Sequence, residues 1–194
     1  MKFLVLFAHP QDKSFQASVH QCVLEALEAA GHVVDDCDLY AEKFQPVLTD
    51  VEMETYHDVS RNVAAVKTYV DRLRDAEGLV FVFPTWWYGM PAILRGYLDR
   101  VWLPGVCFDI VGGKTYPSLQ KITRLVVVTT CGSPYWLNKF YVGDLNRKFF
   151  ARGIGRLISP KAKILWLAQY NMDKATARTK ERFLSTVRKT LSKI

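Results

Sequence analysis

Two short apolar runs of this 194-residue chain each lead into side chains that could do chemistry. The first run, 3–8, is followed by His9 and by Ser14, where a helix pattern begins. The amino end of a helix offers unpaired N–H groups and the positive end of a dipole, which suits a phosphate. Ser14 can add a hydroxyl donor, and His9 an N–H or a positive charge. The alternative is that Ser14 only caps the helix and that His9 is an ordinary turn histidine.

The second run, 79–83, leads into an aromatic loop, Pro84-Thr85-Trp86-Trp87-Tyr88-Gly89-Met90-Pro91. Adjacent tryptophans in such a loop cannot both be buried easily. A flat ring could stack on their faces, while backbone groups bond its polar edge. We expect Gly89 to make the sharp turn that this requires. The alternatives are an aromatic cluster that seals the junction of helix and sheet, and a surface for a protein partner.

A third polar segment, Thr129-Thr130-Cys131-Gly132-Ser133, follows the apolar run 125–130. Its hydroxyls and flexible turn could bind the polar edge of a flat ring, although the same residues also form ordinary turns. A phosphate loop beside a ring-binding loop indicates a flavin, and therefore redox chemistry. Cys131 has no neighbouring histidine, so no thiol nucleophile is expected. The four histidines lack metal-ligand spacing, and no metal is predicted.

Strand and helix patterns alternate along the chain. The predicted strands are 3–8, 33–40, 79–83, 125–130 and 163–169, and the predicted helices are 14–30, 58–76, 91–101, 141–152 and 174–193. Pro91 is expected at the first helical position, and residues 41–57 and 104–120 are expected to be loops, the first with one helical turn. Such alternation predicts a parallel sheet with right-handed crossovers. The fold class is therefore α/β: one flavodoxin-like three-layer sandwich over residues 1–194, with five strands ordered 2-1-3-4-5.

The charge of the chain is unevenly distributed. The net charge is +7, with −7 on residues 1–113 and +14 on residues 114–194. The basic half could attract an anionic cofactor or simply form solvated helix faces. No nucleic-acid motif accompanies it, and no stretch predicts a secretory leader or membrane insertion. Four dispersed cysteines favour reduced thiols in a cytoplasmic protein.

Three blocks of the sequence resemble the NAD(P)H quinone dehydrogenase family. They are Ala8-His9-Pro10 with Ser14-Phe15, the run from Phe83 to Val101, and the run from Thr129 to Ser133. The middle block is the most specific, and the similarity extends to Asp38-Leu39-Tyr40 and Phe44-Gln45-Pro46. The resemblance implies a flavodoxin-like fold, bound FMN or FAD, and a homodimer with active sites at its interface. It also implies ping-pong transfer of a hydride from NAD(P)H, through the flavin, to a quinone or similar small acceptor.

The resemblance also assigns roles to individual residues. The flavin phosphate would be held by His9, Ser14, Phe15 and Gln16. The ring and ribityl chain would meet Pro84, Thr85, Trp86, Trp87 and Tyr88. The other side of the flavin would be lined by Thr129, Thr130, Cys131, Gly132 and Tyr135, whose loop offers backbone N–H groups to the reduced anion. Phe108 would lie over the substrate.

Some features depart from the family pattern. Cys131 stands where the family often has a glycine, and no histidine follows His57. The Tyr–His proton relay of well-studied animal members therefore cannot be drawn, and no catalytic residue is assigned. The first loop lacks the glycines of a dinucleotide fingerprint, and the chain is shorter than the FAD-binding members, so FMN is favoured. The alternatives are a flavodoxin-type electron carrier and a flavin-binding regulatory subunit of a potassium efflux system.

Overall fold

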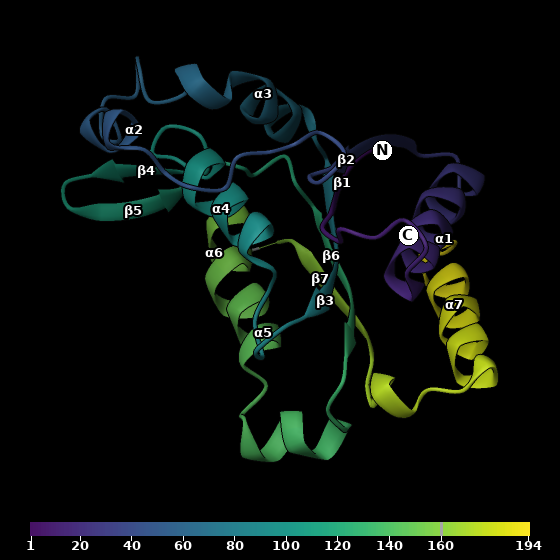
Figure 1. The fold of residues 1–194 in the computed structure, drawn as a ribbon. Helices are drawn as coiled ribbons and strands as arrows, with labels where there is room; N and C mark the ends of the chain where they lie inside the picture. The colour runs from purple at the N-terminus through teal and green to yellow at the C-terminus, as the bar shows by residue number, and fades with distance from the viewer. Residues whose placement is uncertain (160) are drawn as a thin grey trace.

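The computed structural model describes residues 1–159 and 161–194, which form a five-stranded sheet between helices (Figure 1). In spatial order its strands are β2 (Val33–Asp38), β1 (Lys2–Phe7), β3 (Gly78–Thr85), β6 (Arg124–Cys131) and β7 (Lys163–Gln169). All four pairings are parallel. Because β4 and β5 form a separate hairpin, this is the predicted order 2-1-3-4-5, which is confirmed.

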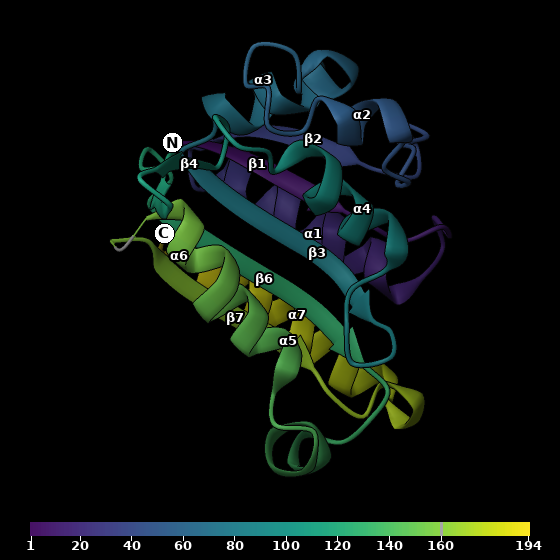
Figure 2. The same ribbon diagram turned by 90° about the vertical axis from the view of Figure 1, so that its left-hand side faces the viewer.

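Helices cover both faces of the sheet (Figure 2). On one face lie α1 (Phe15–Ala29) and α7 (Ala177–Leu191), and on the other α3 (Lys67–Asp75), α4 (Ala92–Val101), α5 (Leu145–Lys148) and α6 (Gly155–Ile158). The short elements are α2 (Asp50–Glu54), the 3-10 turns η1 (Ala64–Val66) and η4 (Met172–Lys174), and the π-helical turns η2 (Leu137–Tyr141) and η3 (Phe149–Ile154). None of the described helices is long and apolar enough to cross a membrane.

The strands divide their side chains between two hydrophobic cores, because successive residues face opposite sides of a sheet. In β3, Phe81 and Phe83 join the core with α3 and α4, whereas Val80 and Val82 join the core with α1 and α7. The three central strands are buried over almost their whole length, as continuous apolar runs predict. The edge strands β2 and β7 are only partly buried, and for β2 this was expected from its polar sequence.

The prediction of a loop over residues 104–120 was wrong in its middle. That segment contains an antiparallel hairpin of β4 (Phe108–Val111) and β5 (Lys114–Pro117). Gly112 and Gly113 connect the strands, with φ of +58° and +74°. Two left-handed residues give the turn that suits the twist of a hairpin, so this Gly-Gly pair was a turn signal between two short strands.

The predicted helix 58–76 was too long. Regular α-helix begins only at Lys67, and side chains hold the preceding segment in another conformation. Asp58 accepts hydrogen bonds from the N–H and hydroxyl of Ser60 at 3.1 and 2.6 Å. Asn62 donates to the carbonyls of Tyr56 and Pro104. Such local bonds compete with those of a helix.

The other helix boundaries shifted for similarly local reasons. The predicted helix 141–152 is divided, because Gly143 and Asp144 have φ of +81° and +58° between η2 and α5. The closing helix starts at Ala177, where the preceding Thr176 accepts a hydrogen bond from Thr179 N–H. Pro91 is the residue before α4 and not its first helical residue.

Gly96 allows a close approach between α4 and the chain after β2. A Cβ at this position would overlap the Pro46 carbonyl oxygen. We expect Gly96→Ala to lower the free energy of unfolding by about 1–3 kcal/mol in urea denaturation, since a packed site resists extra volume. The matched control is Gly153→Ala, whose Cβ would meet nothing closer than Phe149 at 3.8 Å. Equal effects of the two substitutions would show that the approach at Gly96 is not rigid.

Candidate functional site

Three loops meet where the central strands end. Thr85, the last residue of β3, pairs with Cys131, the last residue of β6. On the other side of β3, Phe7 pairs with Val82, so the loop after β1 starts at the same edge. The rings of His9 and Trp86 have centroids 6.1 Å apart. The first and second loops therefore converge, as predicted.

The loop after β1 leads directly into α1. Ser14 is the N-cap, and its hydroxyl accepts a hydrogen bond from Ala17 N–H at 3.1 Å. The N–H groups of Phe15 and Gln16 belong to the first turn and have no carbonyl of the same helix to bond. His9 Nδ1 lies 3.1 Å from the Gln11 nitrogen and 3.3 Å from the Gln11 carbonyl oxygen, so the backbone of the loop holds the ring by Nδ1 and Nε2 is the nitrogen left for a ligand. This arrangement can bind an anion.

The side chain of Gln16 does not face this anion site. It is buried, accepts a hydrogen bond from the Thr130 hydroxyl at 2.9 Å, and donates to the Val128 carbonyl at 3.5 Å. Gln16 therefore ties α1 to β6, and only its backbone N–H remains free for a ligand. A side chain predicted for the ligand is instead used to fix the end of the helix.

A cation from the far end of the chain lies next to the same loop. The Lys180 ammonium sits over the Phe15 ring, 5.5 Å from its centroid, and Phe183 packs against the same ring. Helix α7 therefore adds a positive charge at the amino end of α1. Sequence reasoning missed Lys180, because nothing local in α7 indicates that it contacts residue 15.

The aromatic loop is a tight hairpin turn. Trp86 and Gly89 exchange two backbone hydrogen bonds of 3.0 and 2.9 Å, and the two residues between them, Trp87 and Tyr88, have φ of +51° and +57°. These are the left-handed positions of a type I′ turn, which usually carry Asn or Gly. The expectation that Gly89 makes the turn was therefore wrong, because it follows the two left-handed residues.

The two tryptophans of this turn face outward, whereas Tyr88 is only partly exposed. Trp87 is 99% exposed and Trp86 is 41% exposed. They do not seal the helix–sheet junction, so that alternative is excluded, and both rings are free to contact a ligand. Pro84, by contrast, is buried inside β3. Non-glycine residues held in the left-handed conformation are strained, and such residues cluster at functional sites.

The threonine hydroxyls at the ends of β3 and β6 form hydrogen bonds with other side chains of the protein. The Thr85 and Thr129 hydroxyls are 2.9 Å apart, and Asn146 of α5 donates to Thr85 at 3.3 Å. Thr129 and Thr130 are buried. Asn146 was not predicted, because its contact with Thr85 spans a sequence separation that no local pattern reveals.

The remaining residues of the third loop are packed closely. The Cys131 thiol is buried and lies 3.3 Å from the Ser133 hydroxyl. At Gly132 a Cβ would lie 2.7 Å from a carboxylate oxygen of Asp173. A Cβ there would require the Asp173 side chain to move, so the glycine allows this side chain to pack against the loop.

Tyr135 and Phe108, the last two residues predicted for the site, lie in different surroundings. Tyr135 is half exposed and makes an edge contact with Tyr170 at 5.2 Å. Burial raises the pKa of Tyr170, and Trp166 donates to its hydroxyl at 3.4 Å. Phe108 begins β4, which lies on the side where the strands start, whereas the aromatic turn lies where they end (Figure 2). One chain does not bring Phe108 to the three loops.

A cavity of about 290 Å³ borders the aromatic turn. It is lined by Tyr88, Gly89, Met90, Arg95, Leu145, Asn146 and Phe149. Among the described residues, no group of three His, Cys, Asp or Glu side chains could hold a metal ion. The site thus combines an anion-binding helix end, exposed aromatic rings and an adjoining pocket, which together fit a flat phosphorylated ligand.

A family model described as a flavodoxin-like fold matches residues 1–154. This chain belongs to the flavodoxin-like family. Human ribosyldihydronicotinamide dehydrogenase [quinone] is 32% identical over 165 residues, which cover 76% of this chain and 71% of that protein. The predicted resemblance to the NAD(P)H quinone dehydrogenases is thereby confirmed.

Solved structures agree with this assignment. Smu.1420 from Streptococcus mutans is 28% identical and superposes with a TM-score of 0.89, covering 100% of both chains. The NAD(P)H:quinone oxidoreductase from Methanothermobacter marburgensis is 25% identical with a TM-score of 0.84, covering 99% of this chain and 98% of that one. The similarity therefore spans almost the whole chain, including the part beyond residue 154.

The left-handed backbone conformation of Trp87 lowers the stability of the fold. Its side chain is too exposed to offset this cost by packing. We expect Trp87→Asn to raise the free energy of unfolding by about 1 kcal/mol, because Asn tolerates this conformation and Trp87 is almost fully exposed. Urea denaturation measures the change. Trp87→Phe keeps the strain and serves as the control. If the Asn variant is no more stable than the Phe variant, the turn is not strained.

Proposed function

We propose that this chain is a flavin-dependent oxidoreductase that transfers a hydride from NAD(P)H, through bound FMN, to a quinone or similar small acceptor. The names of its human and archaeal relatives support NAD(P)H or ribosyldihydronicotinamide as donor and quinone as acceptor. The observation that carries the proposal is the exposed Trp86–Trp87 turn next to a helix end flanked by His9 and Lys180. At this position a flat aromatic surface lies next to a site that can bind an anion.

The phosphate of FMN would bind at the amino end of α1. The donors are the Ser14 hydroxyl, the N–H groups of Phe15 and Gln16, and His9 Nε2, with the charge of Lys180 beside them. The loop contains no glycine that would let a pyrophosphate approach the backbone closely. We therefore favour FMN over FAD.

The ring would lie between the aromatic turn and the loop after β6. Trp86, Trp87 and Tyr88 would supply its contact surface, and backbone groups from Thr129 to Gly132 its polar partners, with Tyr135 at the rim. When bound, the flavin supplies the atom that accepts and then donates the hydride. The protein orients the ring and donates N–H groups toward the charge of its reduced form. The hydrogen-bonded pair Thr85–Thr129 fixes the distance between the two walls.

The proposal includes a homodimer of a single domain over residues 1–194, in the cytoplasm. Phe108 does not reach the site of its own chain, so a contact with substrate requires a second copy. Exposed Ile110 and Val111 on the same hairpin, and Val51 on α2, offer apolar surface for that copy. The four cysteines are free and buried, which suits a reducing compartment.

The proposed activity is tested on the purified chain. We expect a flavin absorption spectrum, direct oxidation of NADH or NADPH with menadione as acceptor, and parallel lines in double-reciprocal plots. A flavodoxin-type carrier would bind flavin but would need a separate reductase. A regulatory subunit would bind flavin without turnover and would copurify with a transporter. A chain that takes up neither FMN nor FAD and does not oxidise NAD(P)H contradicts the proposal.

Lys180 gives a sharper test of the phosphate site. We expect Lys180→Gln to weaken FMN binding about tenfold, the equivalent of about 1.4 kcal/mol, by loss of charge beside the phosphate. Riboflavin, which lacks the phosphate, should bind both proteins equally. Lys189→Gln, at the other end of α7, is the control and should bind FMN like the unaltered chain. An equal loss for riboflavin would mean that Lys180 acts on the ring or on the fold.

A further inference from the structure

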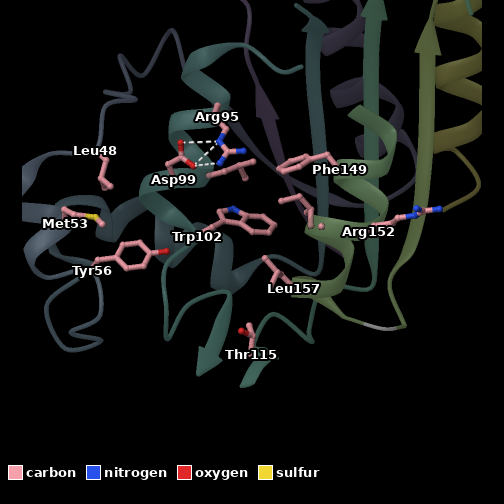
Figure 3. Close-up of a pocket in the computed structure, with 13 residues that line it drawn as sticks. Leu48, Met53, Tyr56, Arg95, Asp99, Trp102, Thr115, Phe149, Arg152 and Leu157 are labelled. Carbon is pink, nitrogen blue, oxygen red and sulfur yellow. Dashed lines mark hydrogen bonds and ion pairs between the residues drawn. The ribbon is translucent and has the colours of Figure 1, made fainter. Parts of the chain in front are cut away.

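The surface of the molecule is also hollowed away from the three loops. A groove of about 700 Å³ lies beside Trp102 on the α4 face, and helical segments supply most of its walls (Figure 3). A smaller groove of about 550 Å³ runs along β7. Its floor is the edge of a strand, so backbone groups as well as side chains are available there to a partner.

The outer edge of β7 is unpaired. This strand is the last of the sheet and pairs with β6 alone (Figure 2). Lys163 N–H bonds the Thr123 carbonyl at 3.0 Å, and along a parallel strand the residues that bond a neighbour alternate with those that face away. The N–H and C=O groups of Ile164, Trp166 and Ala168 therefore point away from β6. No hydrogen-bond partner is found for them in the described part of the chain.

The sequence of β7 does not protect this edge. Edge strands are usually blunted by proline, by charged side chains or by a bulge. Over 164–168 the sequence is Ile-Leu-Trp-Leu-Ala, and the register with β6 is unbroken. Gln169 Nε2 donates to the Tyr170 carbonyl at 2.8 Å, so the free edge ends before that residue. Residues 164–168 thus form a template on which another strand can pair.

The groove borders this edge on both sides of the sheet. Arg182 and Thr186 of α7 line it from one face, and Arg147 of α5 lines it from the other, with Tyr135 beside it. Residues 166–170 form its floor. A strand that pairs with β7 would therefore lie between α7 and α5.

The charge of the groove selects the partner. Arg182 is exposed and forms no ion pair with the residues that the structure describes. Arg147 lies 3.8 Å from Asp144, but that carboxylate also pairs with Lys139 at 3.4 Å. Among the described residues that line the groove, none is an aspartate or glutamate. A second copy of the chain seated here would bring the same arginines against each other, whereas carboxylates would pair with them.

We propose that β7 binds an extended, acidic segment of a partner protein, which adds one strand to the sheet. The backbone of this segment bonds the outward N–H and C=O groups of residues 164–168, and its carboxylates pair with Arg182 and Arg147. The main-chain bonds provide affinity, and the arginines provide selectivity. This interaction goes beyond the proposed oxidoreductase activity and does not rest on it.

The test uses a synthetic peptide and the full chain, with FMN present because Tyr135 also belongs to the proposed flavin site. The probe is the acetylated, fluorescein-labelled peptide Thr-Glu-Val-Glu-Val-Glu-Thr, and fluorescence anisotropy measures its binding. We expect the peptide with lysine in place of each glutamate to bind at least about tenfold more weakly, because its charge matches that of the groove.

Two further versions of the probe test the backbone pairing. Each carries N-methyl groups on alternate residues, so that one version loses the N–H groups that face β7 and the other those that face away. We expect one version to bind at least about tenfold more weakly and the other to bind like the parent peptide. Adsorption by charge alone would affect both versions equally.

Variants of the chain test the two contributions separately. We expect Arg182→Gln to weaken binding about threefold to fivefold, as loss of an exposed ion pair implies. Arg188→Gln is the matched control, because Arg188 lies on the same helix but lines a different cavity, and it should leave binding unchanged. Ala168→Pro removes one outward N–H without a loss of pairing to β6, and it should weaken binding at least about fivefold.

Hydrogen exchange measured by NMR locates the bound peptide. The amides of Trp166 and Ala168 should become protected when the peptide binds, whereas those of Leu165 and Leu167 are already protected by β6. No binding of the glutamate peptide, equal binding of the glutamate and lysine peptides, equal binding of the two methylated versions, or an edge that stays unprotected would each overturn the proposal. Protection that rises with protein concentration in the absence of peptide would also overturn it, since a second copy would then occupy the edge.

Discussion

The parallel pairing of β1, β3 and β6 is the constraint on which the rest of the structure depends. Each strand is buried on both faces, so its side chains are mostly apolar. Few of them could therefore bind a polar ligand or take part in catalysis. Chemistry is therefore confined to the edge where the strands end and the chain returns to solvent. The loops after Phe7, Thr85 and Cys131 share that edge.

The same constraint explains what could be predicted from the sequence. Apolar runs and turn residues predicted the five strands, because both signals are local and strong. The alternation of these strands with helices predicted their order. Lys180 and Asn146 could not be found, since each acts through one long-range contact with the site. Gln16 was assigned to the ligand from its position, yet its side chain turns inward to Thr130. Position in a motif does not determine the direction of a side chain.

The two hydrophobic cores lie on opposite faces of the sheet and separate helix α7 from the groove beside Trp102. Helix α7 packs on α1 and brings the basic end of the chain to the phosphate loop. On the other face, α4 and the segment from η3 to α6 pack on the sheet and leave the groove at Trp102 between them. The acidic first half and basic second half of the sequence thus meet at the proposed flavin site, where the second half contributes Lys180.

Pro84 has a consequence for how far the sheet can extend. Ala8 donates its N–H to the Val82 carbonyl at 3.1 Å, which is the last bond between β1 and β3. In a parallel ladder the next bond would run from the N–H of residue 84 to the Ala8 carbonyl, and proline has no N–H. β1 and β3 therefore cannot continue to pair, and they separate where the first two loops begin. Because Pro84 has no N–H, the sheet ends here and a space for a ligand remains between the two loops.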